Sequence, residues 1–368
     1  MSFYLFPLLF LAFLSILEHA NKLTLLINNK YIYFSIALFF ILFIGLRYNI
    51  GCDWWVYKSL FKRYSSINIF ELIKDAFFLK YRLQEIGHIF ITLISKNIYV
   101  LNLIYSTIFI IPLFYVCSTI RRKYLALVVS YPYYIIVVGM GPIRQAACIS
   151  LLMLSILFIS KKKYIVHFFL TIFTLLIHQF SFIFNGITAG AFFPEFLKNK
   201  LSKKSLFLIL ILISIFAYSL PSLLSKTYSY FTFYGQLTKD GNQIIPPAKS
   251  AIFIWAIHFF PAFIFLKNIS QFKFNNNLKK ILTTLSIFEI ILLPFIFFNS
   301  VVSYRLLLYF FPSSIYITSY LPDLRISRIK SKYILISIIL MAFITEIIWI
   351  QFAYHSYCWV PYKNILFN

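Results

Sequence analysis

The chain has 368 residues, of which 61% are hydrophobic and only 12% are charged, and its mean hydropathy is +0.85. Soluble domains are closer to half apolar and a quarter charged, so this composition excludes an ordinary soluble protein. The net charge of +24 comes from short basic clusters between apolar runs, as the positive-inside bias of membrane proteins produces. No basic domain stands apart from these runs, so we expect no nucleic-acid partner.

Apolar runs of roughly 15 to 22 residues, long enough or nearly long enough to span a membrane, alternate with polar breaks. The runs are continuously apolar, which favours helices over the alternating pattern of a β-barrel strand. The expected spans are 2–17, 31–46, 98–118, 124–139, 142–160, 164–180, 182–197, 205–224, 251–267, 281–298, 304–321 and 333–352. The prediction is an all-α, polytopic helical bundle of about twelve transmembrane helices, with residues 1–368 as a single integral membrane domain.

The basic clusters fall at alternate breaks between the expected spans and so predict the orientation. They are Arg121–Lys123, Lys161–Lys163, Lys198–Lys204, Lys267–Lys280 and Arg325–Lys332, and we place all of them in the cytoplasm. The other breaks and both termini then face outward. Two of the outer segments are long: 48–97, with a short interfacial or re-entrant helix near its end, and 226–250, which we expect to be a mobile loop.

A polar stretch directly follows the second apolar run, at residues 45–57 (GLRYNIGCDWWVY). Aromatic side chains are common at membrane interfaces, and interface anchoring alone would explain the four in this stretch. It does not explain Gly51 and Asp53 beside them. We therefore expect Arg47 and Asp53 to lie at the mouth of the membrane domain, where they could meet a polar substrate that is attached to a lipid.

Three arginines at the ends of expected helices suit phosphate recognition: Arg47, Arg144 and Arg305. Arginine carries a fixed charge and a planar donor fork that matches phosphate oxygens. Arg144 follows Pro142 at a helix start, where the helix dipole and the first amide groups also favour an anion. The alternative is that each arginine reaches the membrane interface or pairs with Asp53 or Glu85.

Several ionisable side chains are candidates for a general base. His178 ends an apolar run, and a neutral imidazole there could take a proton from a hydroxyl group. Asp53 and Glu85 are the carboxylate alternatives, and Glu85 could orient His88 three residues later. The alternative for His178 is a structural role at a helix end.

Other polar residues fit a structural role or a different function. Glu289 and Glu346 lie within apolar spans, and we expect them to be paired inside the bundle, although a proton-coupled transporter would use similar residues. We expect His258 to be a packing residue. Cys52 and Cys358 share the expected outer side and could form a disulfide there, but we expect two free thiols.

The sequence contains no Walker loop, dinucleotide glycine pattern, His-Glu-x-x-His site or Asp-x-Asp pair. A substrate that is already activated, for example by a lipid diphosphate leaving group, therefore fits better than a nucleotide sugar. We expect no cofactor and no metal site, because arginines could supply the positive charge.

Several motifs in the chain resemble those of one known family. Gly45-Leu46-Arg47-Tyr48, followed by Gly51-Cys52-Asp53-Trp54 and Tyr57, resembles the first motif of the EpsG-type branch of Wzy-like polysaccharide polymerases. The resemblance continues in order in Glu85-x-Gly87, Pro142-Ile143-Arg144-Gln145, His178-Gln179-Phe180-Ser181, Tyr304-Arg305 and Pro361-Tyr362. Cys52 is a departure, because such proteins commonly carry threonine there. A hydrogen bond from that hydroxyl group to substrate would be weakened.

The resemblance implies a multi-pass enzyme of the bacterial inner membrane with a GT-C-like bundle. It would polymerise undecaprenyl-diphosphate-linked oligosaccharide repeat units on the periplasmic face to build O-antigen, capsule or exopolysaccharide. Its partners would be the lipid-linked donor and acceptor, membrane lipid and a chain-length regulator. An O-antigen ligase and a flippase or transporter of lipid-linked glycans are the alternatives.

On this reading the candidate residues take three roles. The diphosphate-binding residues are Arg47, Arg144 and Arg305. The catalytic base is one of His178, Asp53 and Glu85. The sugar-binding residues are Trp54, Trp55, Tyr57, Gln145, Gln179 and Tyr304.

Overall fold

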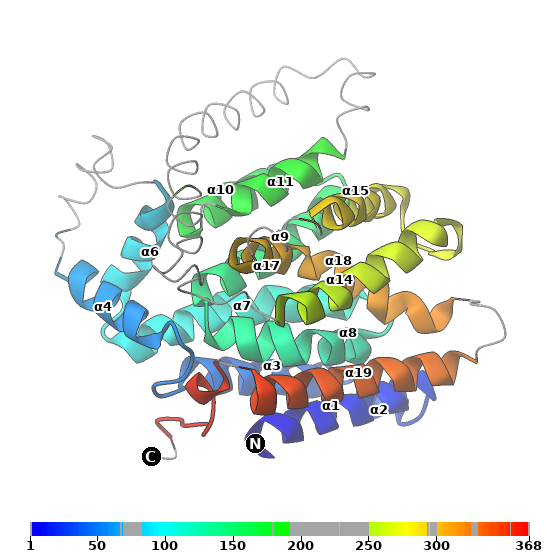
Figure 1. Ribbon diagram of the computed structural model, residues 1–368, viewed down its shortest axis with the longest axis horizontal. Helices are drawn as coiled ribbons and strands as arrows, with labels where there is room; N and C mark the ends of the chain where they lie inside the picture. The colour runs from blue at the N-terminus through cyan, green and yellow to red at the C-terminus, as the bar shows by residue number, and fades with distance from the viewer. Residues whose placement is uncertain are drawn as a thin grey trace, which may run out of the picture. The chain divides into compact units, whose positions relative to one another are not determined.

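The computed structural model describes residues 2–66, 83–178, 180–191, 250–292, 300–324, 330–353 and 355–366, together with 68, 228 and 294. In this part of the chain all regular structure is helical (Figure 1). The chain divides into two compact units. The first unit comprises Met1–Lys74, Gly87–Leu154 and Ile315–Asn368, and the second comprises Asp75–Ile86 and Ser155–Ser314.

The helices that lie wholly or partly in the first unit are α1 (Ser2–His19), α2 (Thr24–Ile27), α3 (Lys30–Gly45), α4 (Trp54–Tyr64), α6 (Leu83–Ile94), α7 (Ile98–Thr119), α8 (Lys123–Ser130), the π-helix η1 (Tyr131–Val138), α9 (Ile143–Ser160), α18 (Phe311–Tyr320), η4 (Leu321–Asp323), α19 (Ser331–Phe352) and η5 (Ser356–Cys358). The remaining helices of the second unit are α10 (Tyr164–Ile177), α11 (Ser181–Gly190), α14 (Ser250–Lys267), η2 (Ile269–Gln271), α15 (Asn276–Leu292), α17 (Ser300–Leu307) and η3 (Leu308–Phe310).

These bounds confirm the all-helical prediction and agree with most of the expected spans to within a few residues. Among the described residues, four helices are long and apolar enough to cross a membrane: α1, α7, α9 and α19. Shorter apolar helices cover Lys30–Gly45, Lys123–Val138, Tyr164–Ile177 and Ala256–Lys267. The count of about twelve stays a prediction. The expected span 205–224 and nearly all of the segment 226–250 lie outside the described residues.

In the first unit, α3 packs along α7, and α1 packs against α8 and α19 (Figure 1). Asn29 and Asn97 begin α3 and α7 as N-caps: the Asn29 side chain accepts a hydrogen bond from Tyr31 N at 2.8 Å, and that of Asn97 accepts one from Val100 N at 2.9 Å. Gly45 permits the close approach of α3 to α7, because a Cβ atom there would lie 2.7 Å from the Ser106 hydroxyl.

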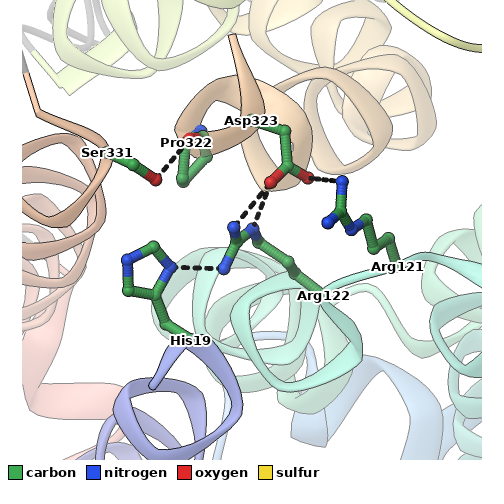
Figure 2. A network of polar contacts seen from close by, with 6 residues as sticks. All are labelled: His19, Arg121, Arg122, Pro322, Asp323 and Ser331. Atoms are coloured by element: carbon green, nitrogen blue, oxygen red, sulfur yellow. Dashed lines mark hydrogen bonds and ion pairs between the residues drawn. The ribbon is translucent and has the colours of Figure 1, made fainter. Parts of the chain in front are cut away.

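A polar network joins three segments of the first unit at one end of its helices (Figure 2). Arg122 donates to Asp323 Oδ1 at 2.5 Å and to His19 Nδ1 at 2.5 Å, and Arg121 lies 3.6 Å from the same carboxylate. The Glu18 carboxylate accepts hydrogen bonds from two amide groups in the first turn of α8, which suits the positive end of a helix. The structure thus joins breaks that the charge pattern assigns to one side of the membrane.

Candidate functional site

Arg47 lies in the loop between α3 and α4, and its guanidinium is buried, with only 1% of the residue exposed. Its three donor groups reach Ile44 O at 2.7 Å, Ile50 O at 3.2 Å and Asn102 Oδ1 at 3.4 Å. The guanidinium also lies over the Trp54 ring, 5.7 Å from its centroid. Burial lowers the pKa of Arg47 to about 10, so the side chain stays charged at neutral pH. This arginine thus supports its loop from within, and its expected place at the mouth of the membrane domain stays a prediction.

Gly51 brings the Arg47 loop against the turn that precedes α9. It has a φ of +92°, and a Cβ atom there would lie only 2.0 Å from the Met140 carbonyl oxygen. Glycine adopts this backbone region without a steric penalty, whereas other residues rarely do. The requirement for glycine is thus conformational, and it places the loop next to the helix that carries Arg144.

A disulfide joins Cys52 of this loop to Cys358, which ends η5, across 306 residues of sequence. The expectation of two free thiols at these positions is wrong. Cys117 and Cys148 are the free cysteines in the described part of the chain, and both are buried in helices.

Arg144 lies in the first turn of α9 and is partly exposed. Its guanidinium lies over the ring of Tyr57, 5.7 Å from the centroid. Tyr57 belongs to α4, which begins directly after Asp53, a partly exposed residue at the N-cap position. Burial raises the pKa of the Tyr57 phenol and Arg144 opposes this shift, so the phenol is neutral at physiological pH. Arg144 therefore combines fixed charge, partial exposure and a helix N-terminus, which Arg47 does not.

His88 is a functional candidate whose surroundings the sequence did not reveal. It is fully buried, its Nδ1 lies 2.8 Å from the Tyr105 hydroxyl, and its ring contacts those of Tyr57 and Tyr64. Its Nε2 has no hydrogen-bond partner among the described residues. Burial and the nearby charge of Arg144 hold the pKa of His88 well below its usual range. The imidazole is therefore neutral at neutral pH.

Glu85 lies in α6, three residues before His88, and its side chain lies outside the described part of the chain. The structure therefore leaves both of its expected roles, as a base and as a partner of His88, as predictions.

The expected sugar-binding aromatic residues differ in exposure. Trp55 is 62% exposed, whereas Trp54 and Tyr57 are buried. Trp54 instead contacts Tyr48 and Tyr99, with ring centroids 6.4 and 6.1 Å apart. A shallow pocket next to these rings is lined by Tyr48, Tyr99, Lys363 and Ile365. Trp55 and this pocket are thus two surfaces in the described part of the first unit that a sugar could reach.

In the second unit, His178 directly follows α10 and is partly buried. Its Nδ1 lies 2.6 Å from the Tyr309 hydroxyl, and Phe184 stacks on Tyr309 with ring centroids 4.5 Å apart. Arg305 lies in α17 and is partly exposed. The structure thus gives His178 a partner that fixes its ring. A shared mouth for His178 and the three arginines stays a prediction.

For three other expected sugar-binding residues, the structure describes no position that a sugar could reach. Gln145 is buried next to Arg144 in α9. Tyr304 lies in α17 with its side chain outside the described part, and Gln179 is not among the described residues.

A buried polar cluster lies deeper in the second unit. His258 Nδ1 lies 3.1 Å from Glu289 Oε1 and 2.8 Å from the Ser314 hydroxyl. The expected pairing of Glu289 is confirmed, and His258 is part of a polar cluster rather than a packing residue. Glu346 of the first unit is also buried, but neither of its carboxylate oxygens has a hydrogen-bond partner in the described part of the chain. Its expected pairing is not found there.

The apolar helices long enough to cross a membrane and the charged loops at their ends define the chain as an integral membrane protein. The model of the EpsG family matches residues 30–364, a range that includes every candidate site residue above, and the chain belongs to the EpsG family. Neither the curated proteins nor the solved structures include a match to the chain. Within the described residues, no group of three histidine, cysteine or acidic side chains is arranged to hold a metal ion.

Proposed function

We propose that this member of the EpsG family polymerises undecaprenyl-diphosphate-linked oligosaccharide repeat units on the outer face of the bacterial inner membrane. The bond between the growing chain and its lipid diphosphate breaks, and a hydroxyl group of the next lipid-linked unit forms the new glycosidic bond. The hydroxyl proton passes to a base, and the lipid diphosphate leaves with the negative charge. Family membership supports a role in polysaccharide biosynthesis, and the candidate site supports the diphosphate donor.

The observation that carries this proposal is the position of Arg144. It is partly exposed in the first turn of α9 and is held over the Tyr57 ring. A guanidinium at a helix N-terminus suits the charge that develops on the leaving diphosphate. We assign diphosphate binding to Arg144 and Arg305, and we assign Arg47, which is buried, to the support of the loop.

The proton acceptor in this proposal is Asp53 or His178. Asp53 is partly exposed at the start of α4, in the loop that Arg47 and Gly51 shape. His178 could act as a base through Nε2 only if its Nδ1 carries the proton and donates it to the Tyr309 hydroxyl. Asp53→Asn and His178→Gln variants separate these assignments. The variant that lacks the true base should still bind the lipid-linked substrate but should not transfer it, whereas the other variant should still transfer it.

A transporter of lipid-linked glycans is the second candidate function. The buried His258–Glu289 pair supports it, because ionisable pairs inside membrane helices often relay protons during transport. The polymerase is favoured by the family match and by the partly exposed Arg144.

The test is the length distribution of surface polysaccharide in a strain that lacks this gene. The strain is complemented with wild type, Arg144→Ala, Arg144→Lys or Arg63→Ala. Arg63 is a matched control, because it lies over the Tyr64 ring at 5.9 Å but is exposed on the other end of α4.

We expect wild type and Arg63→Ala to restore the ladder of chain lengths, and Arg144→Ala to leave a single repeat unit. Lysine should restore little, because it lacks the planar donor fork. Loss of all surface glycan on deletion would instead indicate a ligase or a flippase. An unchanged ladder on deletion would contradict the proposal.

A further inference from the structure

The last residues of the chain form a strap across the Arg47 loop, and we call residues 355–366 the C-terminal strap. Three main-chain hydrogen bonds join the strap to the loop on both sides of Arg47: Tyr48 N to Lys363 O at 3.0 Å, Gly51 N to Cys358 O at 2.8 Å and Ile365 N to Leu46 O at 3.0 Å. The loop therefore has no fixed main-chain partner along this edge until the strap is in place.

The strap is anchored in turn to the apolar helices of the first unit. The Tyr362 hydroxyl donates to Phe43 O of α3 at 2.8 Å, and the two rings stack with centroids 4.4 Å apart. Trp359 Nε1 donates to Ile136 O of η1 at 3.2 Å, and Trp359 O accepts from the Tyr4 hydroxyl at 2.6 Å. These contacts hold the strap to three helices, but none of them reaches the loop beyond Gly51.

The Cys52–Cys358 disulfide connects the strap to the loop beyond Gly51. Cys52 directly precedes Asp53, the N-cap residue of α4, and α4 carries the Tyr57 ring that lies against Arg144. Cys52 is exposed, and Cys358 is partly exposed, so an external oxidant can reach both thiols before the bond forms. The free thiols of the described residues, Cys117 and Cys148, are buried and cannot compete for that oxidant.

We infer that the Cys52–Cys358 disulfide is a positioning bond: it fixes the start of α4, and with it Asp53 and the Tyr57 ring, relative to Arg144. This inference rests on the proposed function, because the geometry that it fixes is that of the proposed transfer site. Cys52 and Cys358 are thus positioning residues that act through Asp53 and Tyr57. Misplacement of catalytic groups by about 1 Å can lower a rate by roughly a hundredfold.

The bond also implies a partner, which is a thiol–disulfide oxidoreductase outside the cytoplasm. The thiolate of one cysteine attacks the disulfide of that protein, and the second cysteine then resolves the mixed disulfide. The new S–S bond forms in this chain, and the partner leaves with two thiols, which carry the two electrons and two protons. Because the cytoplasm keeps thiols reduced, this end of the first unit faces an oxidising compartment, in agreement with the orientation expected from the basic clusters.

The first experiment measures the thiols and does not depend on activity. Membranes that contain the full-length chain are treated with a maleimide that shifts its mobility on a gel, before and after reduction with dithiothreitol. In wild type we expect Cys52 and Cys358 to react only after reduction. In a strain without its extracytoplasmic thiol oxidase, we expect both cysteines to react with the maleimide before reduction. Reaction of both in wild-type membranes before reduction would overturn the inference.

The second experiment measures polymerisation by Cys52→Ser, Cys358→Ser and the double variant in the deletion strain, with Cys117→Ala as the matched control for loss of a thiol. We expect each of the three serine variants to lower polymer per membrane-inserted protein by between about tenfold and a hundredfold. The double variant should be no worse than either single variant, because each removes the same bond. The control should resemble wild type.

The third experiment separates positioning from folding. Purified wild-type protein is assayed with lipid-linked repeat units from the deletion strain, then reduced, then reoxidised. We expect kcat to fall on reduction and to recover on reoxidation, with KM changed by less than about twofold, because the disulfide does not contact the diphosphate. This assay also covers the case in which the serine variants do not reach the membrane.

The results distinguish the two proposals. If wild type restores the ladder and the double serine variant restores it equally well, the positioning role is overturned and the polymerase proposal stands. If wild type itself does not restore polymerisation, the proposed function fails and the positioning role falls with it.

Discussion

The two arginines of the first unit, Arg47 and Arg144, are expected to respond differently to the same substitution. Arg47→Ala removes the donors to two carbonyl groups, Ile44 O and Ile50 O, and to Asn102 Oδ1, all inside the protein. Hydrogen bonds from a charged group contribute about 1.5–3 kcal/mol each, so loss of the two shorter ones lowers the free energy of unfolding by roughly 3–6 kcal/mol. With an unfolding entropy of about 2.1 cal/mol/K per residue, this corresponds to a melting temperature roughly 4–8 °C lower.

The assay compares full-length wild type, Arg47→Ala and Arg144→Ala in detergent by thermal unfolding, and in the deletion strain by polysaccharide length. Arg144 is partly exposed, so its removal should lower the melting temperature less than removal of Arg47 does, while polymerisation is lost. Arg47→Ala should lose both stability and polymer. An unchanged melting temperature in Arg47→Ala with complete loss of polymer would refute this reasoning and return Arg47 to a role in substrate binding.

Three further predictions follow from contacts within the first unit. Gly51→Ala should lower both the melting temperature and polymerisation, because its left-handed φ costs roughly 1–2 kcal/mol for alanine and its Cβ would collide with the Met140 carbonyl group. Arg122→Ala should lower the free energy of unfolding by about 3 kcal/mol, whereas Arg121→Ala, whose side chain is 71% exposed, should change it by less than about 0.5 kcal/mol in the same thermal assay. The pKa of buried His88 is depressed, so the unfolded chain binds a proton that the folded chain does not, and stability should fall as the pH drops below about 6.5. His88→Gln should remove this contribution to the pH dependence of the melting temperature, and an unchanged dependence would contradict the assignment to His88.

The helical architecture could be predicted from the sequence, because continuous apolar runs in lipid have few alternatives to helices. The polar breaks fixed most helix ends to within a few residues, and asparagines at the starts of α3 and α7 mark two of them. The helix α4 was not predicted, because its mixture of charged and aromatic residues resembles an interface segment. A count of spans does not follow from hydropathy alone where runs are shorter than about 18 residues.

The candidate site was predicted less well, because its partners are distant in the sequence. The burial of Arg47 could not be predicted, because it depends on Asn102 and on the loop carbonyl groups that fold back around the guanidinium. The Cys52–Cys358 disulfide spans 306 residues, and no spacing rule connects cysteines that far apart. His88 was linked to Glu85 by sequence spacing, but spacing could not reveal Tyr105 of the next long helix, whose hydroxyl lies at His88 Nδ1.

The first unit contains both the beginning and the end of the chain, with Met1–Lys74 and Ile315–Asn368 in one compact body. During synthesis the Arg47 loop leaves the ribosome long before its hydrogen-bond partners in the strap are translated. The loop therefore lacks these hydrogen-bond partners while more than two hundred intervening residues are synthesised and inserted. A chain that is cut short before the strap would contain Arg47, Asp53 and Arg144 and still lack these main-chain partners. The main-chain pairing of the Arg47 loop therefore depends on translation passing the strap.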